Sequence, residues 1–180
     1  MGKMERLLST AALATGMIVA SAVDSAAQKR VVMETDADEV VTLWDNTTAK
    51  HSNYETQDEV FDGKRVKNTS SADLYIFKAP EDKATGYGIV LVPGGSYRNV
   101  SFSTAYAEWL RDNGVTAAIL KYRLPNYGHK EASYEDAAGA VKYLRENADR
   151  LNVDVRKIGI SGSSAGGHLA AWVSATAKGI

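Results

Sequence analysis

The chain has 180 residues, of which 44% are hydrophobic and 24% are charged, as is ordinary for a globular protein of one domain. Its 21 Lys and Arg against 22 Asp and Glu give a formal net charge of -1, which leaves no electrostatic footprint for nucleic acid. The sequence contains no cysteine, so disulfide bridges, thiolate metal sites and a cysteine nucleophile are excluded.

Residues 1–27 read as a signal peptide. Two basic residues precede the mostly apolar, alanine-rich segment Leu7–Val23, and small residues before Gln28 offer a cleavage site. A membrane anchor is the competing interpretation, but this segment is short and is interrupted by Ser and Thr. We therefore expect a mature chain, residues 28–180, that is secreted or periplasmic and has no stable membrane insertion.

The region from Gln28 to about Pro80 carries β-like and loop-like signals. Val40–Trp44 is a plausible strand, and Asn46–Gln57 is polar and expected to be exposed. Val66–Asn68 and Leu74–Phe77 are candidates for two strands that pair with each other across a short turn.

From Gly86 onward, strands and helices alternate. The apolar run Ile89–Val92 predicts a strand covered on both faces, and a helix over Thr104–Asn113 follows, with Gly114 as its C-terminal cap. Val115–Leu120 is the next expected strand.

A longer helix is expected to begin at Ser133 as its cap, with Asp136 three residues on. Lys157–Ser161 then predicts a third strand, and Gly166–Ala177 a third helix. Alternation of this kind implies right-handed crossovers and a parallel sheet, so the fold class is α/β. The apolar positions of the longer helix recur at three and four residues and predict one face against the sheet: Ala137, Ala140, Val141, Leu144, Ala148 and Leu151.

The most informative motif is Gly162-Ser163-Ser164-Ala165-Gly166, between the third strand and the third helix. Strand, tight turn and helix around G-x-S-x-G are typical of a nucleophile elbow. The glycines leave room for a turn that is too cramped for side chains, and the hydroxyl of Ser164 is expected to stand exposed above the sheet. The candidate catalytic residue is therefore Ser164.

A second motif, Val92-Pro93-Gly94-Gly95-Ser96-Tyr97, ends the first parallel strand. Backbone N–H groups held by glycines can bind the negative charge that develops on a carbonyl oxygen, so Gly94 or Gly95, together with Ala165, are the candidate oxyanion donors. A plain Pro-Gly-Gly turn is the alternative, and the elbow two strands later favours the functional interpretation. Tyr97 is a candidate substrate-binding residue, and Tyr106 is expected to pack.

Together with Lys121–Pro125 and Ile158–Ala170, these motifs resemble the acetyl esterase and lipase families of the α/β-hydrolase superfamily, and above all bacterial acetylxylan-esterase-like proteins. The resemblance covers about Val40–Lys178. It implies an α/β-hydrolase fold, with a mostly parallel sheet flanked by helices. It also implies exported hydrolysis of carboxylic esters, often acetyl groups on plant polysaccharide, without a cofactor or metal.

Two departures from the family stand out. Pro93 occupies a position where related lipases have histidine. The triad acid and histidine of the family normally follow the elbow, but only 14 residues, Gly167–Ile180, remain, and none is acidic. We therefore expect the N-terminal part of such a domain, without its C-terminal strands. In that case Lys157–Ser161 becomes an unprotected sheet edge that favours association.

The three histidines are explained by structural or surface roles. His168 lies on the helix after Ser164, where its ring is poorly aimed to act as a base, so a structural role is favoured. His129 is expected in a surface loop and His51 in solvent, and their separation gives a metal site little to build on.

Three further charged residues are not expected to be catalytic. Asp136 and Arg123 are better explained by a cap and a structural ion pair. Asp154 precedes the third strand, whereas ligands bind beyond the carboxyl ends of such strands.

The sequence thus predicts a serine carboxylesterase acting through an acyl-enzyme on Ser164. A peptidase of the prolyl-oligopeptidase kind, or a non-catalytic hydrolase fragment, are the alternatives. A dinucleotide site is rejected because the glycine spacing G-x-G-x-x-G is missing.

Overall fold

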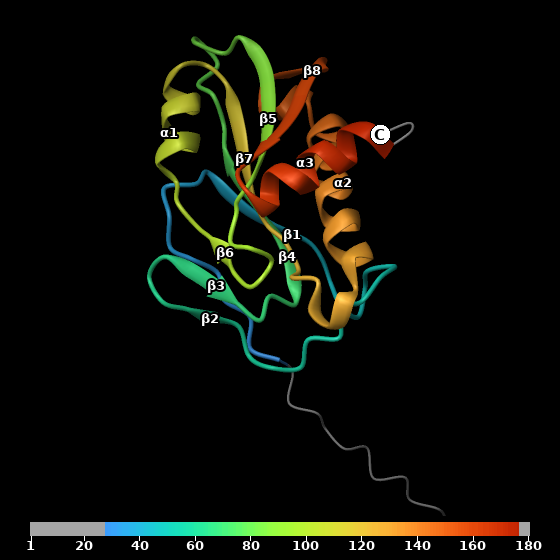
Figure 1. Ribbon diagram of the computed structural model, residues 1–180. Coiled ribbons are helices and arrows are strands. Elements are labelled where there is room, and N and C mark those ends of the chain that lie inside the picture. Colours follow the sequence, from blue (N-terminus) through green and yellow to red (C-terminus); the bar gives the residue numbers. More distant parts are fainter. Residues whose placement is uncertain (1–27, 177–180) are drawn as a thin grey trace, which may run out of the picture.

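The computed structural model describes residues 28–176, so the expected signal peptide lies outside the described residues. A central sheet carries five strands in the order β1-β4-β7-β5-β8, and a small sheet has the order β2-β3-β6 (Figure 1). The central strands are β1 (Glu39–Asp45), β4 (Ser71–Phe77), β5 (Gly86–Val92), β7 (Thr116–Lys121) and β8 (Val153–Gly162). The small sheet consists of β2 (Val60–Phe61), β3 (Arg65–Lys67) and β6 (Val100–Ser101). The α-helices are α1 (Ala105–Asp112), α2 (Lys130–Glu146) and α3 (Ala165–Thr176). Short 3-10 turns lie at Asn126–Gly128 and Asp149–Leu151.

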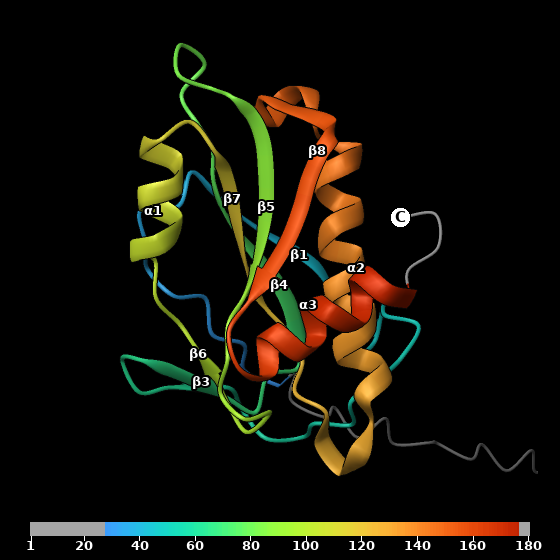
Figure 2. The same cartoon turned by 45° about the horizontal axis from the view of Figure 1, so that its top comes forward.

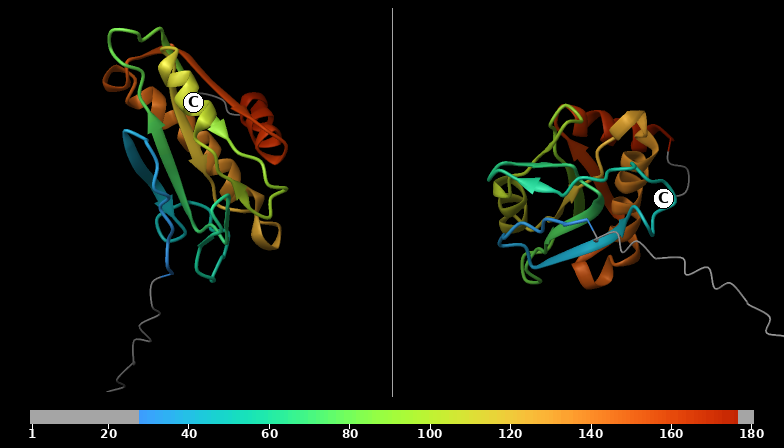
Figure 3. Two further views of the ribbon diagram at one scale, coloured as in Figure 1. Left: turned by 90° about the vertical axis from the view of Figure 1, so that its left-hand side faces the viewer. Right: turned by 90° about the horizontal axis from the view of Figure 1, so that it is seen from below.

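The central sheet is mostly parallel, as expected. β4 runs antiparallel to both β1 and β7, whereas β5 is parallel to β7 and to β8, so four of the five strands point the same way. Helix α1 crosses from β5 to β7, and α2 crosses from β7 to β8. Figures 2 and 3 show α1 on one face of the sheet and α2 with α3 on the other. The α/β class is confirmed.

The core lies around two adjacent interior strands, β4 and β7, in which every residue is buried. Helix α2 covers one face through the apolar stripe that its sequence spacing predicts, with Ala137, Ala140 and Leu144 fully buried. Helices α2 and α3 also meet through Tyr134 and Trp172, whose rings stack with centroids 3.9 Å apart. No helix within residues 28–176 is both long and apolar enough to cross a membrane.

The pairing expected between Val66–Asn68 and Leu74–Phe77 is wrong. β3 pairs with β2 and β6 in the small sheet, whereas β4 lies between β1 and β7. A strand that is apolar on both faces needs cover on both faces, and only the centre of the large sheet provides it. Proximity in sequence does not decide the partner here.

The segment Asn46–Gln57, expected to be exposed, is only partly so. Asn53 is fully buried, and its side-chain amide donates to the carbonyl oxygens of Thr69 and Leu124, both at 2.8 Å. One polar side chain thereby satisfies two buried backbone acceptors and fixes the segment to the loop after β7.

Ser133 is not the cap of α2, as the sequence suggested. The helix begins three residues earlier, at Lys130, and the hydroxyl of Ser133 donates to the carbonyl oxygen of Arg123 at 2.6 Å. That hydroxyl is therefore engaged with the chain after β7, so it is not available to cap the helix.

The expected ion pair between Arg123 and Asp136 is confirmed. Both side chains are fully buried, with 2.6 Å between Nη2 and Oδ1, and the Trp44 indole N–H donates to the same carboxylate at 2.5 Å. Burial raises the pKa of Asp136, while its hydrogen bonds to Arg123 act in the opposite direction. Arg123 also donates to the carbonyl oxygens of His51 and Ala132, so one guanidinium joins the N-terminal loop, β7 and α2.

Replacing Asp136 by Asn should lower the free energy of unfolding by about 3–5 kcal/mol, because Arg123 would remain buried without its counter-charge. Chemical denaturation measures the change. Glu146→Gln, which breaks an exposed pair with Lys142, is the matched control and should cost less than about 0.5 kcal/mol. Equal effects of the two substitutions would contradict the assignment.

Strand β8 forms one edge of the central sheet, as expected for Lys157–Ser161. Most of its residues are exposed or half-buried, and a Cβ atom built on Gly159 would have no neighbour within 4 Å. In residues 28–176 no strand pairs with the outer side of β8. Such an edge presents unpaired N–H and C=O groups to another chain.

We expect the chain to self-associate through this edge, with a sedimentation coefficient that rises with concentration. Gly159→Lys places a charge in open space on the edge strand and should shift the distribution toward monomer. Sedimentation velocity checks both results. A chain that is monomeric at high concentration would exclude association through β8.

Candidate active site

The turn between β8 and α3 holds Ser164 in an uncommon backbone conformation. Its φ is 51°, in the left-handed region that residues other than glycine seldom adopt. The N–H of Ser163 donates to the carbonyl oxygen of Val92 at 3.3 Å, and the N–H of Gly166 donates to that of Ser163 at 2.9 Å. The turn is thus fixed from both ends, and Ser164 is exposed at its apex. This is the strained geometry of a nucleophile elbow.

Steric crowding explains why both of these positions in the motif are glycine. A Cβ atom on Gly166 would lie 2.0 Å from the carbonyl oxygen of Val92, and one on Gly162 would lie 2.4 Å from the backbone of Gly166. The first turn of α3 therefore rests directly on the end of β5, with no space for a methyl group.

Gly166→Ala should lower the free energy of unfolding by about 3 kcal/mol or more, because backbone atoms, which yield little, block the new methyl group. Gly159→Ala, on β8 and in open space, is the control and should change it by less than about 1 kcal/mol. Urea denaturation of both variants measures the difference. Full stability of the Gly166→Ala protein would refute this packing.

The glycine loop after β5 lies directly against the elbow. A Cβ atom on Gly94 would lie 2.8 Å from the carbonyl oxygen of Ser163 and 3.1 Å from the Cβ atom of Ser164. Gly95 has a φ of 140°, and a Cβ atom there would lie 1.9 Å from the carbonyl oxygen of Asn99, so this position also requires glycine. The structure therefore brings the two sequence motifs together.

The carbonyl oxygens of Gly94 and Gly95 accept hydrogen bonds, whereas the backbone N–H groups of the candidate oxyanion donors have no hydrogen-bond partner in the described residues. The oxygen of Gly95 accepts from the N–H groups of Arg98 (2.9 Å) and Asn99 (3.2 Å), and the oxygen of Gly94 accepts from Ser101 (2.9 Å). Among the hydrogen bonds of residues 28–176, none uses an N–H of the three predicted donors, Gly94, Gly95 and Ala165. Their role as oxyanion donors stays a prediction.

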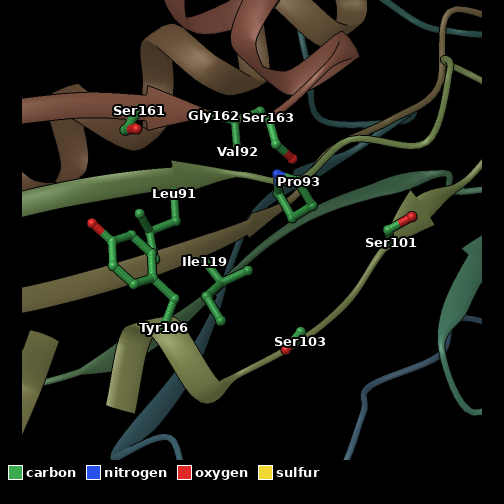
Figure 4. A pocket seen from close by; sticks show the side chains of 10 residues that line it. All are labelled: Leu91, Val92, Pro93, Ser101, Ser103, Tyr106, Ile119, Ser161, Gly162 and Ser163. Atoms are coloured by element: carbon green, nitrogen blue, oxygen red, sulfur yellow. The ribbon is translucent and has the colours of Figure 1, made fainter. Parts of the chain in front are cut away.

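A cavity of about 310 Å³ opens beside the elbow, on the same face of the sheet as α1 (Figure 4). Tyr106 lines it together with Pro93 and Ser163. Tyr106, expected to pack, does stack on Trp109, but 55% of its surface is exposed. The lining contains no charged side chain: Leu91, Val92, Pro93, Ser101, Ser103, Tyr106, Ile119, Ser161, Gly162 and Ser163.

On the other side of the elbow, the side chain of Tyr97 reaches His168. The phenol oxygen lies 2.6 Å from Nδ1 of His168, and both residues line a smaller hollow of about 150 Å³. Burial raises the pKa of Tyr97. Nδ1 of His168 is thus engaged by Tyr97, and in residues 28–176 no histidine side chain hydrogen-bonds to Ser164. The sequence analysis did not predict the contact between Tyr97 and His168. The one indication in the sequence was a histidine one helical turn after the elbow serine.

The remaining candidates lie away from the elbow. His129 is half-buried, with its ring 4.5 Å from that of Tyr54, and His51 is held by its backbone, whose N–H donates to Glu135. Asp154 is the second residue of β8, at the opposite end of the strand from Ser164, and its hydrogen bonds to Arg156 lower its pKa to about 2. Within residues 28–176 no cluster of three potential metal ligands occurs.

The strand order, the glycine loop after β5 and the elbow after β8 together define an α/β-hydrolase fold. The chain belongs to the BD-FAE family, whose model matches residues 73–179. The resemblance drawn from the sequence motifs is thereby confirmed.

Several known proteins are similar to this chain. An acetylxylan esterase of Xylanibacter ruminicola is 32% identical over 96 residues, which are 52% of this chain and 20% of that protein. The acetyl ester-xyloside bifunctional hydrolase of Caldicellulosiruptor lactoaceticus superposes with a TM-score of 0.57 at 31% identity, over 75% of this chain and 46% of that one. Esterase 2 of Thermogutta terrifontis gives 0.54 at 27% identity, over 77% and 46%. The chain thus spans a fifth of the first relative and less than half of each solved structure.

Proposed function

We propose that this chain supplies the nucleophile and the oxyanion donors of an exported serine carboxylesterase that removes acetyl groups, with plant polysaccharide as its substrate class. The observation that carries the proposal is the contact between Gly94 and the turn at Ser164. It places a strained, exposed serine hydroxyl beside uncommitted backbone N–H groups. Membership of the BD-FAE family and the names of the relatives support the ester chemistry.

In the proposed reaction, Ser164 Oγ bonds to the carbonyl carbon of the ester and gives up its proton to a base. The carbonyl oxygen becomes negative and accepts hydrogen bonds from Ala165 and from Gly94 or Gly95. The first N–H groups of α3 also favour negative charge at this point. The C–O bond to the alcohol then breaks, the alcohol takes a proton, and water releases acetate from the acyl-enzyme.

The base is not among the described hydrogen-bond partners of Ser164. His168, the nearest histidine in sequence, has its Nδ1 against Tyr97, and Asp154 lies at the far end of β8. Within residues 28–176 no side chain that could act as the base is hydrogen-bonded to Ser164. A non-catalytic protein that binds an ester or a glycan is therefore the second candidate.

Substrate class and location rest on two further features. Two of the relatives carry acetyl ester and xylan or xyloside in their names, and the cavity beside the elbow is lined without charge, which suits a neutral ester. The basic and then apolar start of the sequence supports export.

Ser164→Ala should abolish the release of 4-nitrophenol from 4-nitrophenyl acetate, by a factor of about 10⁴ or more where a base is present. The assay is run on the 180-residue chain and on the longest product of its reading frame. Ser174→Ala is the control, because that hydroxyl bonds only within α3, to the carbonyl oxygen of Ala170.

Turnover that survives Ser164→Ala unchanged would overturn the nucleophile. If neither form turns over an ester, yet acetylated xylan binds, the non-catalytic candidate holds. Full activity of the 180-residue form, lost with Ser164→Ala, would place the base within this sequence.

A further inference from the structure

One side-chain contact connects the glycine loop to the helix that follows the nucleophile. Tyr97 belongs to the loop, His168 to α3, and 2.6 Å separates Oη from Nδ1. The two rings meet edge to face, at 89° and with centroids 5.9 Å apart. Among the hydrogen bonds found in residues 28–176, this is the only one that joins residues 93–99 to residues 163–176.

The loop has reason to need an external restraint. Ser96 and Tyr97 have φ values of 55° and 58°, so two consecutive residues other than glycine hold left-handed conformations. Each such residue costs about 1–3 kcal/mol and persists only where its surroundings hold it. At its start the loop is fixed by the Tyr122 hydroxyl, which donates to the carbonyl oxygen of Pro93 at 3.1 Å. The remaining backbone bonds close the loop on itself or onto β6.

The contact can be a hydrogen bond in either direction, because a phenol hydroxyl and a histidine ring nitrogen can each donate or accept. Burial raises the pKa of the Tyr97 phenol. In either direction the bond joins the glycine loop to α3. His168 is itself fixed to the elbow, because its backbone N–H donates to the carbonyl oxygen of Ser164 at 3.1 Å.

We propose that Tyr97 and His168 are a positioning pair that holds the oxyanion donors of the glycine loop at a fixed separation from Ser164. The catalytic part of this inference rests on the proposed function, whereas the mechanical part does not. In this role the pair acts through the position of the loop, and no contact of either side chain with the reacting atoms is invoked. Loosening the bond lets Gly94 and Gly95 drift from the position of the developing oxyanion, which weakens transition-state binding more than substrate binding.

Tyr97→Phe removes the hydroxyl and keeps the ring against Tyr122. It should lower kcat for 4-nitrophenyl acetate about 10- to 100-fold and change KM by less than about twofold. His168→Ala should act alike. His168→Asn, whose side-chain amide can donate or accept in place of Nδ1, should restore most of the loss. Tyr134→Phe is the control, since it removes a neighbouring tyrosine hydroxyl from the same hollow but leaves the pair intact.

A second measurement works without turnover. In the ¹⁵N-labelled 180-residue chain, amide order parameters at Gly95 and Ser96 should be near 0.85 and should fall below about 0.6 in Tyr97→Phe, but not in Tyr134→Phe. Unchanged order parameters in Tyr97→Phe would overturn the proposal, and so would a mobile loop with unchanged kcat. If Ser164→Ala leaves turnover intact while Tyr97→Phe frees the loop, the restraint stands and the proposed function fails.

Discussion

The contact between the first turn of α3 and the end of β5 determines the rest of the site. Gly166 lies so close to the carbonyl oxygen of Val92 that a methyl group would stand 2.0 Å from it. Two residues earlier in the same turn, Ser164 has a positive φ of 51°. The close approach of Gly166 to Val92 also carries the elbow onto the glycine loop, because that loop begins one residue after Val92. Nucleophile and oxyanion donors are therefore placed by one packing constraint.

Buried charges give the same end of the sheet its rigidity. Lys121, at the end of β7, is fully buried between the carboxylates of Glu59 (2.6 Å) and Asp73 (2.7 Å), and two residues later Arg123 binds Asp136. Breaking such pairs is costly because the remaining charge stays out of water. These ionic contacts join the irregular N-terminal segments to the strand beside β5. The ion pairs thus hold in place the strand ends from which the loops near Ser164 begin.

Much of this arrangement could be predicted from the sequence, because it follows from local pattern. The apolar run Ile89–Val92, the stripe on α2 and the glycine spacing of the elbow each need only their own neighbours in the chain. What failed depends on partners far away in sequence. The hydroxyl of Ser133 donates to the carbonyl oxygen of Arg123, which no capping pattern shows. β4 pairs with β1 and β7 in the central sheet, and not with the nearby β3.

The contact of Tyr97 with His168 also depends on residues far apart in sequence, since the two residues come from separate elements. The candidate donors were named from composition and spacing, whereas their freedom from other acceptors is visible only in the folded chain. Whether Ser164 acts as a nucleophile remains a prediction.

The pairing of β5 with β8 has an evolutionary consequence. Val92 lies opposite Gly162, so the two halves of the site meet across neighbouring strands, although α1, β7 and α2 intervene in the sequence. Insertions or exchanges at the far ends of those intervening elements leave that meeting point undisturbed. A lineage can therefore remodel the surroundings of the site while the contact between Gly94 and the turn at Ser164 is kept.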